Sequence, residues 1–239
     1  MRVRRVLVLT TVIMVLCAAC SKNENQNNAV QTTQETADSA DQAEQKEEAE
    51  LSNANEEVTK DNFRSFPVSD ESIFTVIETD DGVEIKSCKR DIQDKVIVVP
   101  EMIGGKKVVG IGFGAFTEIG SVEAIVLPDS VERLGDGAFT GCENLKYVYL
   151  GTGLKCTGDA TFNYCNALKE IDLPEGMTTM NGRIAGRCSG LEIITVPATV
   201  TEIKTGIISA HEFEGVIRTP AGSEAEKYAM EHGLNVENY

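Results

Sequence analysis

Four prolines of the 239-residue chain recur at multiples of a single spacing. Pro128, Pro174, Pro197 and Pro220 lie 46, 23 and 23 residues apart, and 46 is twice 23. Gly151 stands where the missing proline of this series would fall. Self-similarity at a fixed period of about 20 to 50 residues is typical of a solenoid, in which each repeat is too small to bury its own apolar face. The spacing therefore predicts a stack of 23-residue turns.

Apolar residues follow the same period, and they mark the side of each turn that faces the core. The segment from Leu145 to Leu150 has the L-x-x-L-x-L form of a leucine-rich repeat strand. Stacking such turns places like residues over like in one continuous core. The columns at 23-residue spacing include Phe116, Phe139 and Phe162; Val122, Leu145, Leu168 and Leu191; Ile125, Val148, Ile171, Ile194 and Ile217; and Cys142, Cys165 and Cys188.

The unit LPDSVERLGDGAFTGCENLKYVYL, residues 127–150, resembles the BspA-type leucine-rich repeat of bacterial surface proteins. The recognisable parts are the strand that ends in proline, Gly137-Ala138-Phe139, and Gly141-Cys142 before the next strand. The resemblance extends over roughly residues 72–239. It implies a leucine-rich repeat solenoid of the α/β horseshoe-like class, with a curved parallel β-sheet and with short turns or helical corners on the convex side. It also implies adhesion or recognition of an extracellular or host protein.

Both flanks of the repeats, which we assign to residues 96–220, have the signals of caps. In residues 61–95, two apolar runs surround Asp80-Asp81-Gly82, which predicts a β-hairpin. In residues 221–239, Ser223 precedes an acidic first turn and Gly233 follows the last one, which predicts a capped α-helix with a capping box to Glu226. Pro100 to Pro128 spans 28 residues, one repeat plus an insertion around Gly104-Gly105.

The first 60 residues predict export and a tether. Three arginines precede an apolar run over residues 6–16, as in a secretory signal. Cys17 to Cys20 resembles a bacterial lipobox, which implies a signal peptide over 1–19, lipidation of Cys20 and membrane attachment of an exported, cell-surface lipoprotein. An ordinary cleaved signal or an uncleaved anchor are the alternatives. Residues 20–60 are acidic and poor in apolar residues, so we expect a disordered tether.

Charge and cysteine spacing restrict the chemistry. The chain has a formal net charge of −16, which argues against nucleic acid, because nucleic-acid binding depends on Lys and Arg neutralising phosphates. Cys142, Cys165 and Cys188 lie one turn apart, so we expect buried free thiols, with disulfides as the alternative. After Cys20 there is no C-x-x-C pair, and the chain has only two histidines. We predict no catalytic, cofactor or metal site and therefore no enzyme.

The candidate binding surface lies on the other side of the strands. In L-x-x-L-x-L the intervening residues face the concave sheet surface. The alternative is that β-branched and aromatic residues stand at these positions only because they suit any strand. We predict a lipid-anchored module that binds a host, matrix or envelope protein here; a structural or envelope-assembly lipoprotein, with glycan binding as a variant, is the alternative. The candidate partner-binding residues are Val96, Val98, Ala124, Val126, Tyr147, Tyr149, Glu170 and Asp172.

Overall fold

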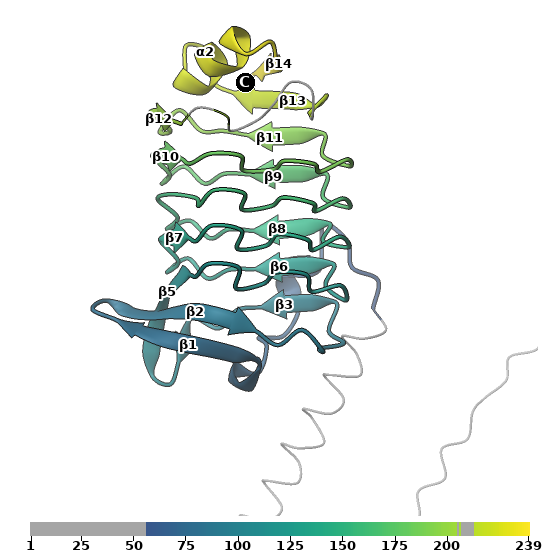
Figure 1. Cartoon of the computed structure of the whole chain (residues 1–239), viewed down its shortest axis with the longest axis vertical. Coiled ribbons are helices and arrows are strands. Elements are labelled where there is room, and N and C mark those ends of the chain that lie inside the picture. The colour runs from purple at the N-terminus through teal and green to yellow at the C-terminus, as the bar shows by residue number, and fades with distance from the viewer. Residues whose placement is uncertain (1–55, 205, 207–212) are drawn as a thin grey trace, which may run out of the picture. The chain divides into compact units, whose positions relative to one another are not determined.

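The computed structural model describes residues 56–204, 206 and 213–239. The predicted signal peptide, Cys20 and most of the predicted tether lie outside these residues. The described residues form a coil whose turns stack along one axis, with short strands repeating on two sides (Figure 1). The predicted leucine-rich repeat solenoid is confirmed.

The main sheet contains one short strand from each turn. Its pairing is parallel and in register with the repeat, so that Ile125 lies opposite Val148 and Ile171 opposite Ile194. Pairing joins the strands in two groups, β3–β6–β8 and β9–β11–β13–β14; among the described residues no pairing joins β8 to β9. The strands are β3 (Val96–Val98), β6 (Ala124–Val126), β8 (Tyr147–Tyr149), β9 (Glu170–Asp172), β11 (Ile193–Thr195), β13 (Val216–Thr219) and β14 (Asn235–Asn238).

A second column of strands closes the opposite side of each turn (Figure 1). Here pairing continues without interruption, because Cys156 bridges in parallel to Arg133 on one side and to Thr179 on the other. The turns that contain β8 and β9 are therefore joined on this side although they are not paired in the main sheet. The strands are β5 (Lys106–Ile111), β7 (Arg133–Leu134), β10 (Thr179–Met180) and β12 (Glu202–Ile203).

The N-terminal cap is the hairpin that the Asp-Gly turn predicts. Strands β1 (Phe74–Thr79) and β2 (Gly82–Cys88) pair antiparallel, and β2 then pairs parallel with β5 of the first turn. Two 3₁₀ turns precede the hairpin, η1 (Phe63–Ser65) and η2 (Glu71–Ile73). The insertion after Pro100 is a second small hairpin, in which β4 (Met102–Ile103) pairs antiparallel with β5. Gly104 and Gly105 make its turn at φ +58° and +75°, a left-handed conformation that glycine adopts without steric cost.

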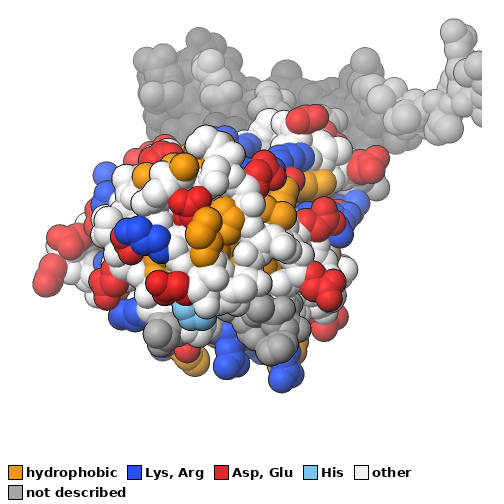
Figure 2. Space-filling model, turned by 90° about the horizontal axis from the view of Figure 1, so that it is seen from above, with side chains coloured by type: hydrophobic (Ala, Val, Ile, Leu, Met, Phe, Trp, Pro, Cys, Tyr) orange, Lys and Arg blue, Asp and Glu red, His pale blue; other side chains and the backbone are white. Residues whose placement is uncertain are grey.

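The C-terminal cap contains the predicted helix, α2 (Glu224–Glu231). The Ser223 hydroxyl accepts a hydrogen bond from the Glu226 amide at 3.1 Å, as expected of an N-cap. The reciprocal bond differs from a standard capping box, because the Glu226 carboxylate accepts from the Gly222 amide, one residue earlier. Strand β14, which the sequence did not predict, then adds to β13 in parallel. Seen from this end, apolar side chains form only small patches among charged ones, as a solenoid cap requires (Figure 2).

A ladder of aromatic rings runs through the core. The Phe116 and Phe139 ring centroids are 5.4 Å apart, and those of Phe139 and Phe162 are 5.1 Å apart, with all three side chains fully buried. Phe74 of the hairpin cap packs edge-on against Phe116. The ladder therefore joins the N-terminal cap to three successive turns.

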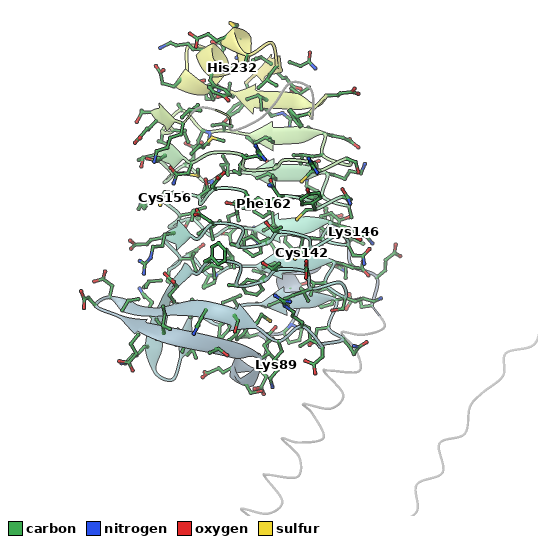
Figure 3. All side chains as sticks on the ribbon, viewed as in Figure 1. Lys89, Cys142, Lys146, Cys156, Phe162 and His232 are labelled. Carbon is green, nitrogen blue, oxygen red and sulfur yellow. The ribbon has the colours of Figure 1, made fainter. Side chains whose placement is uncertain are left out.

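The cysteine column is buried in the same core as this ladder, and Figure 3 labels Cys142 and Phe162, one member of each. The thiols of Cys142, Cys165 and Cys188 are free, and each is within hydrogen-bonding distance, 2.8–3.2 Å, of a phenylalanine carbonyl of the preceding turn. Burial raises the pKa of Cys142 and of Cys188 to about 11. At neutral pH these thiols are therefore protonated donors within the core, and any stability that they contribute is lost only as the pH rises from about 9 through 11.

Replacement of Phe139 by Ala should lower the free energy of unfolding by about 3–5 kcal/mol, because it removes the middle ring of the ladder and leaves a cavity. Urea denaturation of the purified chain would measure this. Phe113→Ala is the matched control, since that side chain is 82% exposed and its loss should change stability by less than about 0.5 kcal/mol. Equal effects of the two substitutions would contradict the assigned register.

Candidate concave binding face

The eight candidate partner-binding residues lie on the concave face, but four of them are covered by another part of the chain. Val96, Val98, Ala124 and Val126 are all buried, at 9% exposure or less. The prediction that these four residues are open to a partner is therefore wrong for this structure. The physical reason is that residues 56–69, here called the N-terminal strap, lie across them.

The N-terminal strap is held by an apolar cluster of its own. Val58, Phe63 and Phe66 are buried against the four covered residues, and this cluster is separate from the main core. At the far end of the strap, the Ser69 amide donates to the Val98 carbonyl at 2.9 Å, and the Ser69 hydroxyl accepts from the Val98 amide at 3.1 Å. In Figure 1 the chain ahead of β1 runs beside β3, β6 and β8.

Tyr147 and Tyr149 of β8 lie beside Phe63 and Arg64 of the strap. The Phe63 ring stacks on Tyr147 with centroids 5.5 Å apart, and the Arg64 guanidinium lies 3.7 Å from the centroid of the Tyr149 ring. Both tyrosines are half-buried. One face of each predicted aromatic anchor is therefore already occupied by the chain itself.

Asp129 fixes the orientation of Tyr149. Its carboxylate accepts from the Thr152 amide at 2.9 Å and from the Tyr149 hydroxyl at 3.0 Å. These two bonds lower the pKa of Asp129, the amide more than the hydroxyl. Burial, with the bond to Asp129 second, raises the pKa of Tyr149, so that this hydroxyl remains a donor at neutral pH.

Beyond the tyrosines the concave face contains a hollow of about 530 Å³. Its walls are β8, β9, the turns that follow these two strands, and residues 60, 63 and 64 of the strap. Glu170, on β9, forms an ion pair with Lys60 of the strap. Asp172 is exposed, and so is Glu175 in the turn beyond it. Of the eight predicted residues, Tyr147, Tyr149, Glu170 and Asp172 thus line one concavity.

Most cations at this hollow are paired. Lys146 bonds to Glu123 at 2.7 Å and Lys169 to Glu192 at 2.8 Å, in both cases with a glutamate that does not line the hollow. Figure 3 shows Lys146 at the outer edge of the stack, on the side of the strap. The hollow therefore presents aromatic rings, main-chain groups and carboxylates, a combination that is suited to binding a ligand.

The described residues contain neither a candidate metal cluster nor a helix that could span a membrane. No group of three or more His, Cys, Asp and Glu side chains in this part of the chain could hold a metal ion. None of its helices is long and apolar enough to cross a membrane.

Comparison with known proteins agrees with the repeat geometry. The BspA type leucine-rich repeat region matches residues 101–217 in six copies. The repeat region therefore belongs to the BspA-type leucine-rich repeat family. No curated protein matches the chain.

Two solved structures are similar to the described fold. One is a leucine-rich repeat protein of T. pallidum, at 26% identity and a TM-score of 0.59, covering 64% of this chain and 71% of its own. The other is a leucine-rich cell surface protein of Faecalibacterium prausnitzii, at 26% identity and a TM-score of 0.56, covering 64% of this chain and 39% of its own. The chain thus spans well under half of the second protein.

Phe63→Ala should detach the strap, because it removes the ring stacked on Tyr147 and the centre of the second apolar cluster. A loss of about 3 kcal/mol in the local opening free energy is expected, which would accelerate hydrogen exchange at the Ser65 and Ser69 amides roughly a hundredfold. Binding of a hydrophobic dye should rise as the covered valines become exposed. The control is Asp61→Ala, an exposed residue of the same strap; exchange unchanged in both variants would show that the strap is not held by Phe63.

Proposed function

We propose that the chain is a lipid-anchored, cell-surface leucine-rich repeat module that binds a protein partner through the open part of its concave face. The family of the repeat region supports an interaction or adhesion module. The similar F. prausnitzii structure is of a cell surface protein, which supports the same location for this chain.

The observation that carries the proposal is the hollow beside the strap. Aromatic residues with one polar end are favoured anchors at protein interfaces, and Tyr147 and Tyr149 lie at its wall in fixed orientations. Its 530 Å³ volume is within the range of about 300–1,000 Å³ found for ligand sites. The strap narrows the binding surface to β8, β9, β11 and β13, because it covers the strands before them.

In this proposal the chain is attached to the cell envelope, and its partner is a protein that reaches it from outside the cell. Lipidation of Cys20 would fix the N-terminus at a membrane, and the acidic residues up to the strap would hold the solenoid away from an anionic surface. The strap, residues 56–69, takes up the last five residues of the predicted tether, 56–60, and continues the chain from there.

Capture of partners from envelope extracts and from host extracellular matrix, with the chain from residue 21 to 239 as bait, tests the concave face. Thr195→Arg places a long side chain on the concave side of β11 and should abolish capture of any specific partner. Thr178→Arg is the control, because Thr178 is exposed beside the second strand column. A partner retained equally by both variants would place binding elsewhere on the molecule.

Cys20→Ser in the full-length chain should abolish incorporation of labelled palmitate and release the protein from the membrane fraction into the medium or periplasm. Cys17→Ser should retain the label, because that cysteine precedes the proposed cleavage point. Labelling that survives Cys20→Ser would refute the lipid anchor while leaving the concave-face proposal to its own test.

A further inference from the structure

The N-terminal strap is attached to the stack differently from the two end caps. Strand pairing holds those caps, since β2 pairs with β5 and β14 pairs with β13. Residues 56–69 contain no strand. Among the described residues, no main-chain hydrogen bond joins residues 56–68 to the rest of the chain, and the strap is tied through its backbone at its last residue, Ser69. Its hold on the concave face therefore depends on side chains.

The strap satisfies several of its own polar groups through Asn62. The Thr59 amide donates to the side-chain oxygen of Asn62 at 2.8 Å, and the side-chain nitrogen of Asn62 donates to the Glu57 carbonyl at 2.9 Å. The Ser65 hydroxyl donates to the Asn62 carbonyl at 2.7 Å. Because these bonds lie within the strap, the strap can leave the face without breaking them.

Aromatic rings make most of the contact between the strap and the face. Phe63 and Phe66 are both 7% exposed, and the Phe63 ring stacks on Tyr147. Among the described residues the strap has one ion pair with the body, Lys60 with Glu170, whose side chains are 62% and 35% exposed, so that solvent screens it. The attachment therefore rests mainly on apolar burial.

Arg64 of the strap occupies a site for a cation. Its guanidinium lies 3.7 Å from the centroid of the Tyr149 ring, which is a cation–π geometry. The Thr152 amide and the Tyr149 hydroxyl lower the pKa of Asp129 most, and the nearby charge of Arg64 lowers it further. The ring of Tyr149 and the carboxylate of Asp129 thus act together on one guanidinium.

The surface beneath the strap is apolar and separate from the main core. Val96, Val98, Ala124 and Val126 form a cluster with the strap and the two tyrosines, and no residue of this cluster belongs to the core between the turns. Removal of the strap would leave the phenylalanine ladder in place and uncover a continuous apolar surface. Exposed surfaces of this kind are typical of sites for protein interaction.

We propose that the strap is a displaceable occupant of the concave face, and that a protein partner docks beneath it with a segment in which an aromatic residue is followed by an arginine; this rests on the proposed function and adds the chemistry of the partner. The aromatic ring would stack on Tyr147 in place of Phe63. The guanidinium would lie over Tyr149, beside Asp129, in place of Arg64.

The hollow beside the strap favours a different protein over a second copy of the chain as the occupant. Tyr147 and Tyr149 also line this hollow, so a partner that takes the place of the strap can continue into it and gain contacts there. A second copy could offer Phe63 and Arg64 only by releasing its own strap. Covalent attachment keeps that strap at a high effective concentration beside its own face.

The test measures whether the face binds such a segment that is supplied separately. The probe is a blocked peptide with the sequence of residues 58–69, VTKDNFRSFPVS. The receptor, here called the uncovered chain, is residues 21 to 239 with Phe63→Ala and Phe66→Ala. Calorimetry should detect binding of the peptide to the uncovered chain, and binding at least about tenfold weaker to the wild-type chain, because the resident strap competes.

Two altered peptides test the chemistry of the segment. Replacement of the first phenylalanine of the peptide by alanine should weaken binding at least about tenfold, because it removes the ring that stacks on Tyr147. Replacement of its arginine by alanine should weaken binding about fivefold, because it removes the cation over Tyr149.

The wild-type chain provides a second readout that requires no substitution. The peptide binds only the form in which the strap is detached. At ten times its dissociation constant for the uncovered chain, it should therefore accelerate hydrogen exchange at the Ser69 amide of the wild-type chain about tenfold. The same peptide with alanine in place of both phenylalanines should leave this exchange unchanged.

Two further variants of the uncovered chain locate the binding. Ala124→Arg places a long charged side chain in the middle of the face and should abolish peptide binding. Thr178→Arg is the matched control and should change the affinity less than about twofold, because Thr178 is exposed beside the second strand column.

Three results would overturn the proposal: no binding at millimolar peptide, binding that Ala124→Arg does not affect, or self-association of the wild-type chain that Ala124→Arg abolishes, which would assign the face to a second copy. A partner that Thr195→Arg blocks, in the absence of any peptide binding, would refute the covered face alone. Peptide binding with no protein captured by either the wild-type or the uncovered chain would instead count against the proposed surface role.

Discussion

The whole fold depends on burial between turns that have no core of their own. A turn of 23 residues places one phenylalanine, one cysteine and a few aliphatic side chains inward, and each gains its contacts from the turn above and the turn below. The ring spacings of 5.4 and 5.1 Å along the phenylalanine ladder are close to the strand spacing of about 4.8 Å, so backbone pairing and ring stacking reinforce each other. The cysteine column follows the same rule, since each thiol lies within hydrogen-bonding distance of a carbonyl of the turn before.

Because burial comes from neighbouring turns, any surface without a neighbour needs a cover. The β1–β2 hairpin and the α2–β14 unit provide covers at the two ends. The N-terminal strap does the same for a face: valines on the concave side of β3 and β6 would otherwise be exposed, and Phe63 and Phe66 bury them. The strap is thus both a third cap and the boundary that leaves the concave face open only from β8 onward.

The period made the core predictable because identical residues occupy equivalent environments. The register of Ile125 with Val148, the hairpin at Asp80-Asp81-Gly82 and the helix after Ser223 all follow from local or periodic patterns. The strap could not be predicted in this way, since Phe63 and Tyr147 meet across 84 residues and belong to no common column. A signal was present in the two aromatic residues at positions 63 and 66, which directly follow a stretch of polar tether. The repeat pattern was enough to place Val96 and Val98 on the correct face of the sheet. Their exposure was misjudged because the contact of Phe63 with Tyr147 was not known.

A periodic fold also makes its departures informative. In a stack whose turns all follow one pattern, a substitution that shifts a strand needs other bonds to compensate for the shift. At the turn of Gly151, the bonds of Asp129 to Thr152 and Tyr149 provide this compensation. That turn gains contacts with the preceding one, and its strand loses pairing with the next. Free main-chain groups at the edge of a parted sheet are costly unless water or a ligand satisfies them. The missing proline is therefore more than a gap in the series: it coincides with the one place along the described main sheet where strand pairing is interrupted.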